Sequence, residues 1–355
     1  MIWRGSLDKK GNNPALGRMT TEGAMKGFAK YGAVALMLAA MTGCGDKGGA
    51  DKDGEAAKTT GALTIGFSQI GSESGWRAAE TKLAKSEAEK RGINLKVSDA
   101  QQQQANQIKA IRSFIAQGVD AILLAPVISS GWDEVLGEAK AANIPVVLLD
   151  RQIDTADPGL YLSAVTSDTV EEGRVAGRWL VSTLAGRDCR VVEIQGTIGA
   201  SLVGNRKKGF EEGISTAANV QIVRTQSGEF TRAKGKEVME GFIKAEAPGS
   251  ICAVYAHNDD MMIGAIQAMK EAGLKPGSDI LAVSIDAVPD IFKAMADGDA
   301  NATVELTPDM ASRAYDLLAA YKKDGTVPPK WVQTPSTLYL PDTAAAEYER
   351  RKDLY

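Results

Sequence analysis

Short runs rich in Ile, Leu and Val alternate with longer helical patterns throughout the chain after residue 61, and this alternation constrains the fold most strongly. The runs are continuously apolar, which is typical of parallel strands covered on both faces. The helical patterns between the first four runs end at Gly92, Gly118 and Asn143, residue types that commonly terminate helices. The sequence therefore predicts an α/β fold built on parallel sheets.

The alternation occurs twice in tandem. Expected strands of the first array are residues 63–68, 93–99, 120–126, 144–150 and 160–166; those of the second are 189–196, 220–227, 251–259 and 280–286. A further strand (301–307), helix (308–325) and strand (334–342) follow, so we expect the chain to cross back between two doubly wound lobes and form a three-segment hinge. The expected lobes are 62–165 with 306–332, and 166–305 with 333–355.

The first residues have the pattern of an export signal. A basic end, a short apolar run and the sequence "MTGC" resemble a bacterial lipoprotein signal, in which Cys44 becomes the lipidated first residue. Residues 1–43 are therefore predicted to be a signal peptide. Residues 44–61, rich in Gly, Lys and Asp, are predicted to be a flexible tether. These features predict a periplasmic or other extracytoplasmic protein; the alternative is an ordinary secreted protein with an unmodified Cys44.

Composition excludes some functions. The net charge of −4 argues against a nucleic-acid binder. The single histidine excludes a metal site built on several histidines, and no cofactor motif is found: "GTIGAS" at 196–201 is a Gly-rich turn without the lysine of a phosphate loop.

Cys189 and Cys252 are predicted to form a disulfide. They lie at the amino ends of the first and third strands of the second array. In the common strand order 2-1-3-4-5 these strands are neighbours, and export favours a disulfide. The alternative is two small buried thiols.

Polar and aromatic residues gather where the expected strands end. In open α/β sheets, ligands bind at the carboxyl ends of the strands. The residues there, or in the crossing segments, are Glu73, Trp76, Arg77, Asp150, Arg151, Arg206, Phe230, Asn258, Asp286 and Glu305. Carboxylates accept hydrogen bonds from sugar hydroxyls, Arg and Asn donate to them, and an aromatic ring packs against the C–H face of a sugar. The set therefore predicts a monosaccharide site.

Several of these residues have a second interpretation. Asp150 and Arg151 could form a surface ion pair, and Trp76 could be a core residue of a helix. In "HNDD" at 257–260, Asp259 or Asp260 is expected to cap the following helix, and Asn258 could do the same. The lone His257 is expected to lie at the rim of the site or to be a structural residue.

The residues at these strand ends resemble the pentose and hexose class of periplasmic binding proteins, the receptors of ABC sugar importers. The segments that carry the resemblance are "PVVLLDRQID", "NRKKGFEEGI", "YAHNDDMMIGAIQAM" and "VSIDAVPDIFKAM". "SESGWR" at 72–77 and "SGEFTRAKGKEVM" at 227–239 look like those of the galactofuranose binders within that class.

The resemblance implies a type I periplasmic binding protein: a monomer without enzymatic activity or cofactor, which binds galactofuranose or a related aldose and delivers it to an ABC permease. It also implies ligand contacts from the whole segment 73–77, which adds Ser74 and Gly75 to the set, and it places Glu305 at the hinge. Two alternatives remain, a sugar sensor for a membrane kinase and a glycosidase. Against the glycosidase, Arg or Asn partners are expected to hold Asp150 and Asp286 ionised.

Overall fold

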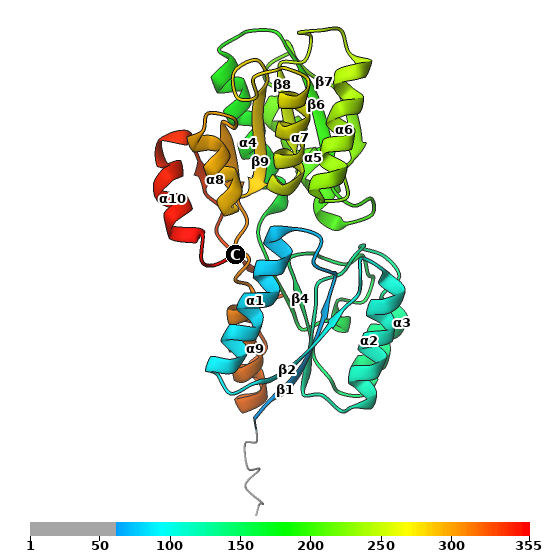
Figure 1. Ribbon diagram of the computed structural model, residues 1–355. Coiled ribbons are helices and arrows are strands. Elements are labelled where there is room, and N and C mark those ends of the chain that lie inside the picture. The colour runs from blue at the N-terminus through cyan, green and yellow to red at the C-terminus, as the bar shows by residue number, and fades with distance from the viewer. Residues whose placement is uncertain (1–61) are drawn as a thin grey trace, which may run out of the picture. The chain divides into compact units, whose positions relative to one another are not determined.

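The computed structural model describes residues 62–355 (Figure 1). The predicted signal peptide, the lipidation of Cys44 and the tether lie outside these residues. Within them, no helix is both long and apolar enough to cross a membrane.

The N-terminal lobe is a six-stranded sheet in the order β11-β5-β4-β3-β1-β2, with every neighbouring pair parallel. Its strands are β1 (Thr64–Gln69), β2 (Asn94–Asp99), β3 (Ala121–Leu124), β4 (Val146–Leu149), β5 (Ser163–Thr166) and β11 (Trp331–Gln333). Its helices are α1 (Gly75–Lys90), α2 (Gln104–Ala116), α3 (Asp133–Ala141), the 3-10 turn η1 (Pro158–Leu160) and α9 (Ala311–Asp324). Helices α1 and α9 pack together on one face, and α2 and α3 cover the other (Figure 1).

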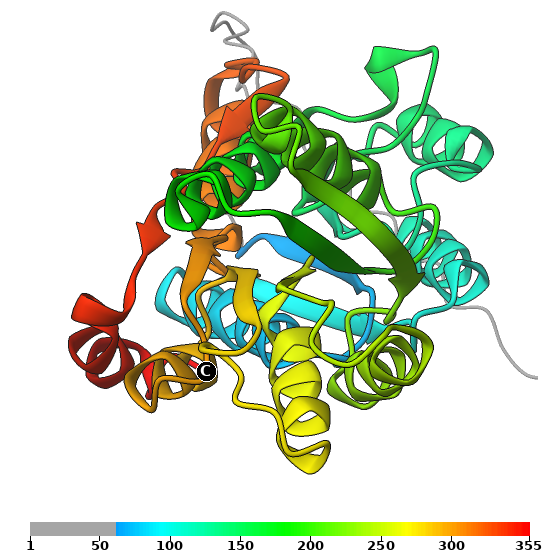
Figure 2. The ribbon, with the colours of Figure 1, turned by 90° about the horizontal axis from the view of Figure 1, so that it is seen from above.

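The C-terminal lobe is a second six-stranded sheet, in the order β12-β10-β9-β8-β6-β7. Its strands are β6 (Cys189–Gln195), β7 (Val220–Ser227), β8 (Ala253–Ala256), β9 (Leu281–Asp286), β10 (Ala302–Glu305) and the antiparallel β12 (Leu338–Tyr339). Its helices are α4 (Thr169–Leu184), α5 (Ser201–Ile214), α6 (Arg232–Ala245), α7 (Asp259–Glu271), α8 (Pro289–Ala296), the 3-10 turn η2 (Pro341–Thr343) and α10 (Ala344–Arg351). Helices lie on both faces of this sheet (Figure 2).

The predicted doubly wound lobes and three-segment hinge are confirmed. The chain passes from one sheet to the other after β5, after β10 and after β11. Both lobes contain the expected neighbours: β1 lies between β2 and β3, and β6 lies between β7 and β8.

Some boundaries differ from the predicted ones. The strand expected at 160–166 begins only at Ser163, because Pro158 starts the turn η1 before it. The strand expected at 334–342 is reduced to two residues, and the short β11 was not foreseen. Strands of two or three residues have no periodicity that a sequence pattern can reveal.

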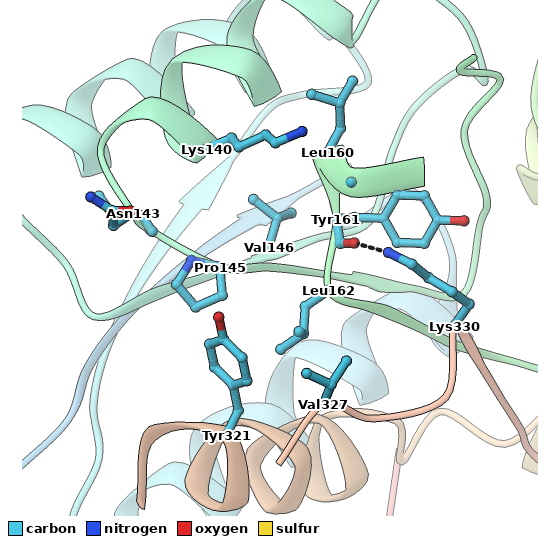
Figure 3. A pocket seen from close by; sticks show the side chains of 12 residues that line it. Lys140, Asn143, Pro145, Val146, Leu160, Tyr161, Leu162, Tyr321, Val327 and Lys330 are labelled. Atoms are coloured by element: carbon cyan, nitrogen blue, oxygen red, sulfur yellow. Dashed lines mark hydrogen bonds between the residues drawn. The ribbon is translucent and has the colours of Figure 1, made fainter. Parts of the chain in front are cut away.

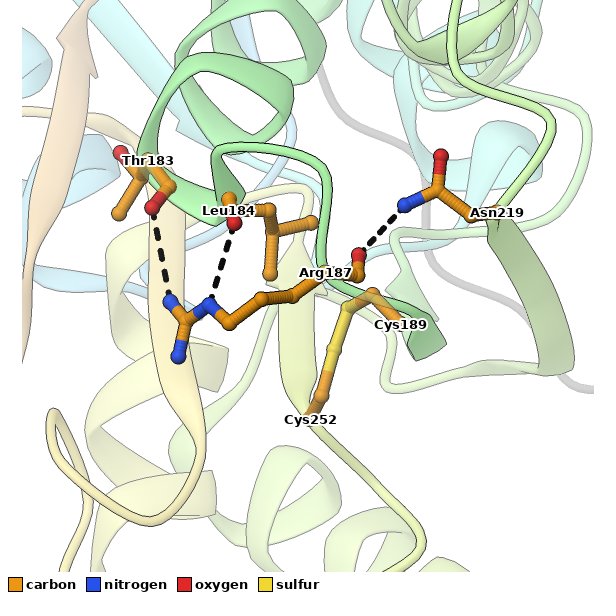
Figure 4. Close-up of a disulfide and its surroundings, with 6 residues drawn as sticks. All are labelled: Thr183, Leu184, Arg187, Cys189, Asn219 and Cys252. Carbon is orange, nitrogen blue, oxygen red and sulfur yellow. Dashed lines mark hydrogen bonds between the residues drawn. A yellow bond between two sulfur atoms is a disulfide. The ribbon is translucent and has the colours of Figure 1, made fainter.

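The predicted disulfide joins Cys189 and Cys252 (Figure 4). Cys189 opens β6 and Cys252 directly precedes the neighbouring strand β8, which places their Cα atoms 5.4 Å apart. Beside it, Asn219 donates to the carbonyl oxygen of Arg187, whose guanidinium donates to the end of α4 (Figure 4). The disulfide therefore ties the amino ends of two central strands, at the edge of the sheet opposite the predicted ligand site.

Candidate functional site

Asp150 and Asp286 occupy equivalent places in the two lobes. Asp150 directly follows β4, and Asp286 is the last residue of β9, the fourth strand of its own array. Both residues have positive φ, 63° for Asp150 and 125° for Asp286, which is unfavourable for a residue with a Cβ. Such strain is commonly retained at functional sites, where the surrounding structure fixes the direction of a side chain.

A cavity between the two lobes gathers most of the predicted ligand-binding residues. Ten of the twelve line it: Glu73, Ser74, Trp76, Arg77, Asp150, Arg151, Arg206, Phe230, Asn258 and Asp286. Leu202 and Leu306 also line it and were not predicted, because an apolar residue beside a strand end has no signal in the sequence that separates it from the core. The volume of about 20 Å³ is that of a water-sized space. The lobes must therefore separate, or side chains must move, before a larger molecule can enter.

Arg77 organises the N-terminal side of the cavity. Its guanidinium lies 2.5 Å from Glu80, 2.5 Å from Asp150 and 3.4 Å from Glu73, and all four side chains are buried. Burial alone would lower the pKa of Arg77, but Glu80, Asp150 and Glu73 outweigh burial and raise the pKa. Arg77 is therefore a fixed cation that orients Asp150.

Arg151 has fewer charged partners than Arg77. Its Nη1 donates to the carbonyl oxygen of Val127 at 2.8 Å, and its Nε lies 3.5 Å from Asp150 without a hydrogen bond. Burial, followed by repulsion from Arg77, lowers the pKa of Arg151 to about 10. Since Asp150 and Arg151 are both buried, the interpretation as a surface ion pair is wrong.

Arg206 holds the C-terminal side of the cavity. Its Nε donates to Glu172 at 2.9 Å and its Nη1 to the carbonyl oxygen of His257 at 2.6 Å, while its Nη2 lies 3.8 Å from Asp286. Burial raises the pKa of Asp286 well above its ordinary value, although Arg206 lowers it in part. Arg206 therefore offsets only part of the effect of burial on the pKa of Asp286, because it lies 3.8 Å away without a hydrogen bond to this carboxylate.

Asn258 is the residue that caps α7. Its Oδ1 accepts from the backbone N–H of Met261 at 2.9 Å, and its Nδ2 donates to the carbonyl oxygen of Phe230 at 3.2 Å. The prediction that Asp259 or Asp260 caps the helix is wrong. Asp259 instead accepts hydrogen bonds from residues in and after β9 and in β10, and Asp260 accepts from the other lobe.

The aromatic walls are also structural. Trp76 is buried in the hydrophobic core as well as lining the cavity, and its indole N–H donates to the carbonyl oxygen of Leu306 at 2.6 Å. The interpretation of Trp76 as a core residue is thus confirmed, and its contact with a ligand stays a prediction. The ring of Phe230 lies against Gly196, where any Cβ would come within 1.8 Å of it, and the guanidinium of Arg151 lies 5.1 Å from its centroid, across the lobes.

Two predicted ligand residues lie outside the cavity lining. The backbone N–H of Gly75 donates to Asp260 at 2.9 Å. Glu305 is bound to Arg351 at 2.6 Å and to the hydroxyl of Tyr339 at 3.3 Å. Glu305 is thus committed to holding α10 and β12 beside the hinge.

His257 is a structural residue, as one of its two expected roles proposed. Its ring is fully buried, and its Nε2 lies 3.0 Å from Glu193. Burial lowers the pKa of His257, even though Glu193 favours the charged form. Within residues 62–355, no cluster of His, Cys, Asp and Glu has the arrangement of a metal site.

A larger cavity, of about 360 Å³, lies at the amino edge of the N-terminal sheet (Figure 3). Both lysines of its lining are already paired: Lys330 donates to the carbonyl oxygen of Tyr161 (Figure 3), and Lys140 binds Asp157 at 2.8 Å. The lining of the small cavity between the lobes contrasts with this. Buried polar atoms of Glu73, Asp150 and Arg151 there have no hydrogen-bond partner among the described residues. The small cavity is therefore the stronger candidate for a polar ligand.

Comparison with known proteins identifies the family. Residues 65–326 match the model of the periplasmic binding protein domain. The chain is 66% identical to the galactofuranose-binding protein YtfQ of Escherichia coli over 82% of this chain and 92% of that protein. A crystal structure of a galactofuranose-binding protein matches with a TM-score of 0.82, at 66% identity over 82% of this chain and 99% of that one. The binding-protein component of an arabinose ABC transporter from Shewanella sp. ANA-3, bound to α- and β-L-arabinofuranose, matches with a TM-score of 0.80, at 56% identity over 82% and 96% of the two chains.

Apart from the short strands β11 and β12, the matched region contains the strands of both sheets, two of the three crossings and all the residues that line the cavity between the lobes. Fold, cavity and similarity agree, and the chain belongs to the periplasmic binding protein family.

Proposed function

We propose that this protein is the binding component of an ABC sugar importer, and that it holds a monosaccharide in the furanose form, galactofuranose or a related sugar, between its two lobes. The observation that carries the proposal is the mixture of unpartnered buried atoms in the cavity lining. Oε2 of Glu73 and Oδ1 of Asp150 can accept hydrogen bonds, while Nε of Arg151 can donate one. Because a hydroxyl group both donates and accepts, a polyol can satisfy acceptors and donors that lie side by side.

The apolar part of the lining supports a sugar over a simple polyol. Trp76 and Phe230 come from opposite lobes and both line the cavity. An aromatic face is suited to the C–H groups of a sugar ring. The furanose form is supported by the relatives, one named for galactofuranose and one bound to arabinofuranose.

Binding is proposed to proceed by hinge closure without a chemical step. The small cavity volume supports an opening of the lobes around the three crossing segments, and a ligand that touches both lobes would stabilise the closed form by its differential affinity. The lobes are proposed to comprise residues 62–165 with 306–332, and 166–305 with 333–355. The protein is proposed to act as a monomer that presents its closed form to a permease, and to be tethered outside the cytoplasm through Cys44.

The test is calorimetric titration of residues 62–355 with galactose, L-arabinose, ribose and glucose. Galactose contains a small furanose fraction in slow exchange, so saturation is expected only after many equivalents of total galactose per protein. Tight binding of ribose or glucose at full stoichiometry would contradict the furanose proposal. Absence of binding to all four would contradict a monosaccharide site.

A glycosidase is the second candidate, favoured by one observation. The raised pKa of Asp286 is the property that a general acid needs. Asp150, however, forms an ion pair with Arg77 at 2.5 Å, so it is a poor candidate for the second carboxylate that a glycosidase needs. Release of nitrophenol from a nitrophenyl galactofuranoside would establish hydrolysis, and its absence at stoichiometric protein would remove this candidate.

A further inference from the structure

One carboxylate of the C-terminal lobe binds the N-terminal lobe outside the cavity. Oδ2 of Asp260, in the first turn of α7, accepts a hydrogen bond of 2.9 Å from the backbone N–H of Gly75, the first residue of α1. Asp260 is 2% exposed. The N-terminus of a helix carries unpaired N–H groups and a partial positive charge, so a carboxylate is favoured there.

Asp260 is held in place by its own lobe. Its Oδ1 accepts from Nε of Arg232 at 2.5 Å, and Nη2 of Arg232 also binds Asp290 at 2.6 Å. These contacts lie within the C-terminal lobe and persist when the lobes separate. The carboxylate is therefore already oriented before it meets Gly75, which reduces the entropy cost of forming the contact.

Gly75 is the junction between this contact and the cavity. It lies between Ser74, which caps α1, and Trp76, and both neighbours line the cavity together with Arg77. A bond to the backbone of Gly75 therefore fixes the position of the whole first turn of α1 relative to the C-terminal lobe. The side chain of Asp260 does not itself line the cavity.

We infer that Asp260 is a positioning residue for ligand binding: it docks on the N-terminus of α1 when the lobes close and raises affinity without touching the ligand. The inference rests on the proposed function for its effect on affinity. Its effect on closure is independent of which ligand binds, because the bond joins protein atoms alone.

The chain offers a perturbation from each side of the bond. Asp260→Ala removes the acceptor. Gly75→Pro replaces the donor hydrogen with a ring carbon that also crowds Oδ2 of Asp260, so it removes the bond and opposes the close approach of the two lobes at this point. It should preserve the helix, because proline is favoured at the first helical position and the preceding Ser74 has the extended backbone, φ −139° and ψ 160°, that proline requires. Asp290→Asn is the matched control. It weakens the other ion pair of Arg232, which joins two residues of the C-terminal lobe, and leaves the bond between Asp260 and Gly75 in place.

The first readout is affinity for L-arabinose and galactose, with association and dissociation followed by stopped flow. We expect Asp260→Ala and Gly75→Pro each to weaken binding about tenfold, mainly through faster dissociation, the size expected for a charged hydrogen bond. The double variant should be little weaker than the worse single variant, because both changes remove one bond. Asp290→Asn should stay within twofold of wild type.

The second readout is small-angle scattering without sugar, on variants whose thermal unfolding shows that they are folded. A larger radius of gyration for Asp260→Ala and Gly75→Pro than for Asp290→Asn is expected. Additive losses of affinity, or affinities and radii equal to those of the control, would overturn the inference. If wild type binds neither sugar, the proposed function fails, and scattering alone decides whether Asp260 favours closure.

Discussion

Replacing Arg77 with methionine tests whether the buried charges beside the cavity depend on one another. Arg77 lies 2.5 Å from both Glu80 and Asp150 and 3.4 Å from Glu73. Removing one partner of a buried ion pair typically costs about 3–5 kcal/mol, because the remaining charge is left without compensation. At roughly 2 °C per kcal/mol for a chain of this size, the melting temperature should fall by about 6–10 °C. Urea unfolding at pH 7 measures the loss directly.

The loss should depend on pH with a definite sign. Burial raises the pKa of Glu80 in the folded state, and Arg77 lowers it in part, so without Arg77 this pKa should rise further above its unfolded value of about 4. The variant is then most destabilised above that raised pKa, and the deficit shrinks as the pH falls below it toward about 4, where Glu80 takes up a proton in the unfolded state as well. Arg91→Met, at the C-cap of the same helix, is the control. Arg91 is 31% exposed in its side chain and pairs with exposed Asp316, so its loss should cost less than about 1 kcal/mol. The reasoning would be refuted if the two variants lost equal free energies of unfolding, or if the loss for Arg77→Met did not change with pH.

Three further predictions concern single features. Reducing the Cys189–Cys252 disulfide, which closes 63 residues, should lower the free energy of unfolding by about 4 kcal/mol in the chain-entropy model, measured by urea unfolding with and without reductant. Burial raises the pKa of Asp259 to about 7, so the folded state binds the carboxyl proton more tightly than the unfolded state does. The free energy of unfolding should therefore fall as the pH rises from about 4 through 7, and Asp259→Asn should make it depend less on pH over that range. Trp76→Ala should abolish sugar binding in calorimetry and, by opening a core cavity, cost about 3–5 kcal/mol of stability; retained affinity would remove Trp76 from the site.

Local sequence signals were sufficient for the sheets because both lobes are built from consecutive strand–helix units. In such units each strand lies close to its neighbours in the sequence, and the connections obey strong rules of handedness and order. Those rules placed Cys189 beside Cys252, and they brought Asp150 and Asp286 to the carboxyl edges of their sheets. The cavity followed from the topology rather than from any single motif.

Partners that come from distant segments could not be predicted in this way. Glu305 lies at a crossing between the lobes, but its carboxylate accepts a hydrogen bond from Arg351, which is 46 residues later in the chain. Asp259 has the residue type of a helix cap, yet the hydroxyls of Ser284 and Thr303 draw its carboxylate into the lobe and leave capping to Asn258. In both cases the hydrogen-bond partner comes from a segment distant in the sequence, and no local pattern records it.

The first turn of α1 explains why so short a segment as "SESGWR" is distinctive. Arg77 orients Asp150 inside the cavity, Trp76 binds the carbonyl oxygen of Leu306 at the start of the second crossing, and Gly75 receives Asp260 from the opposite lobe. Ligand site, hinge and inter-lobe contact therefore meet in three consecutive residues. A change at any of them should therefore alter affinity and closure together.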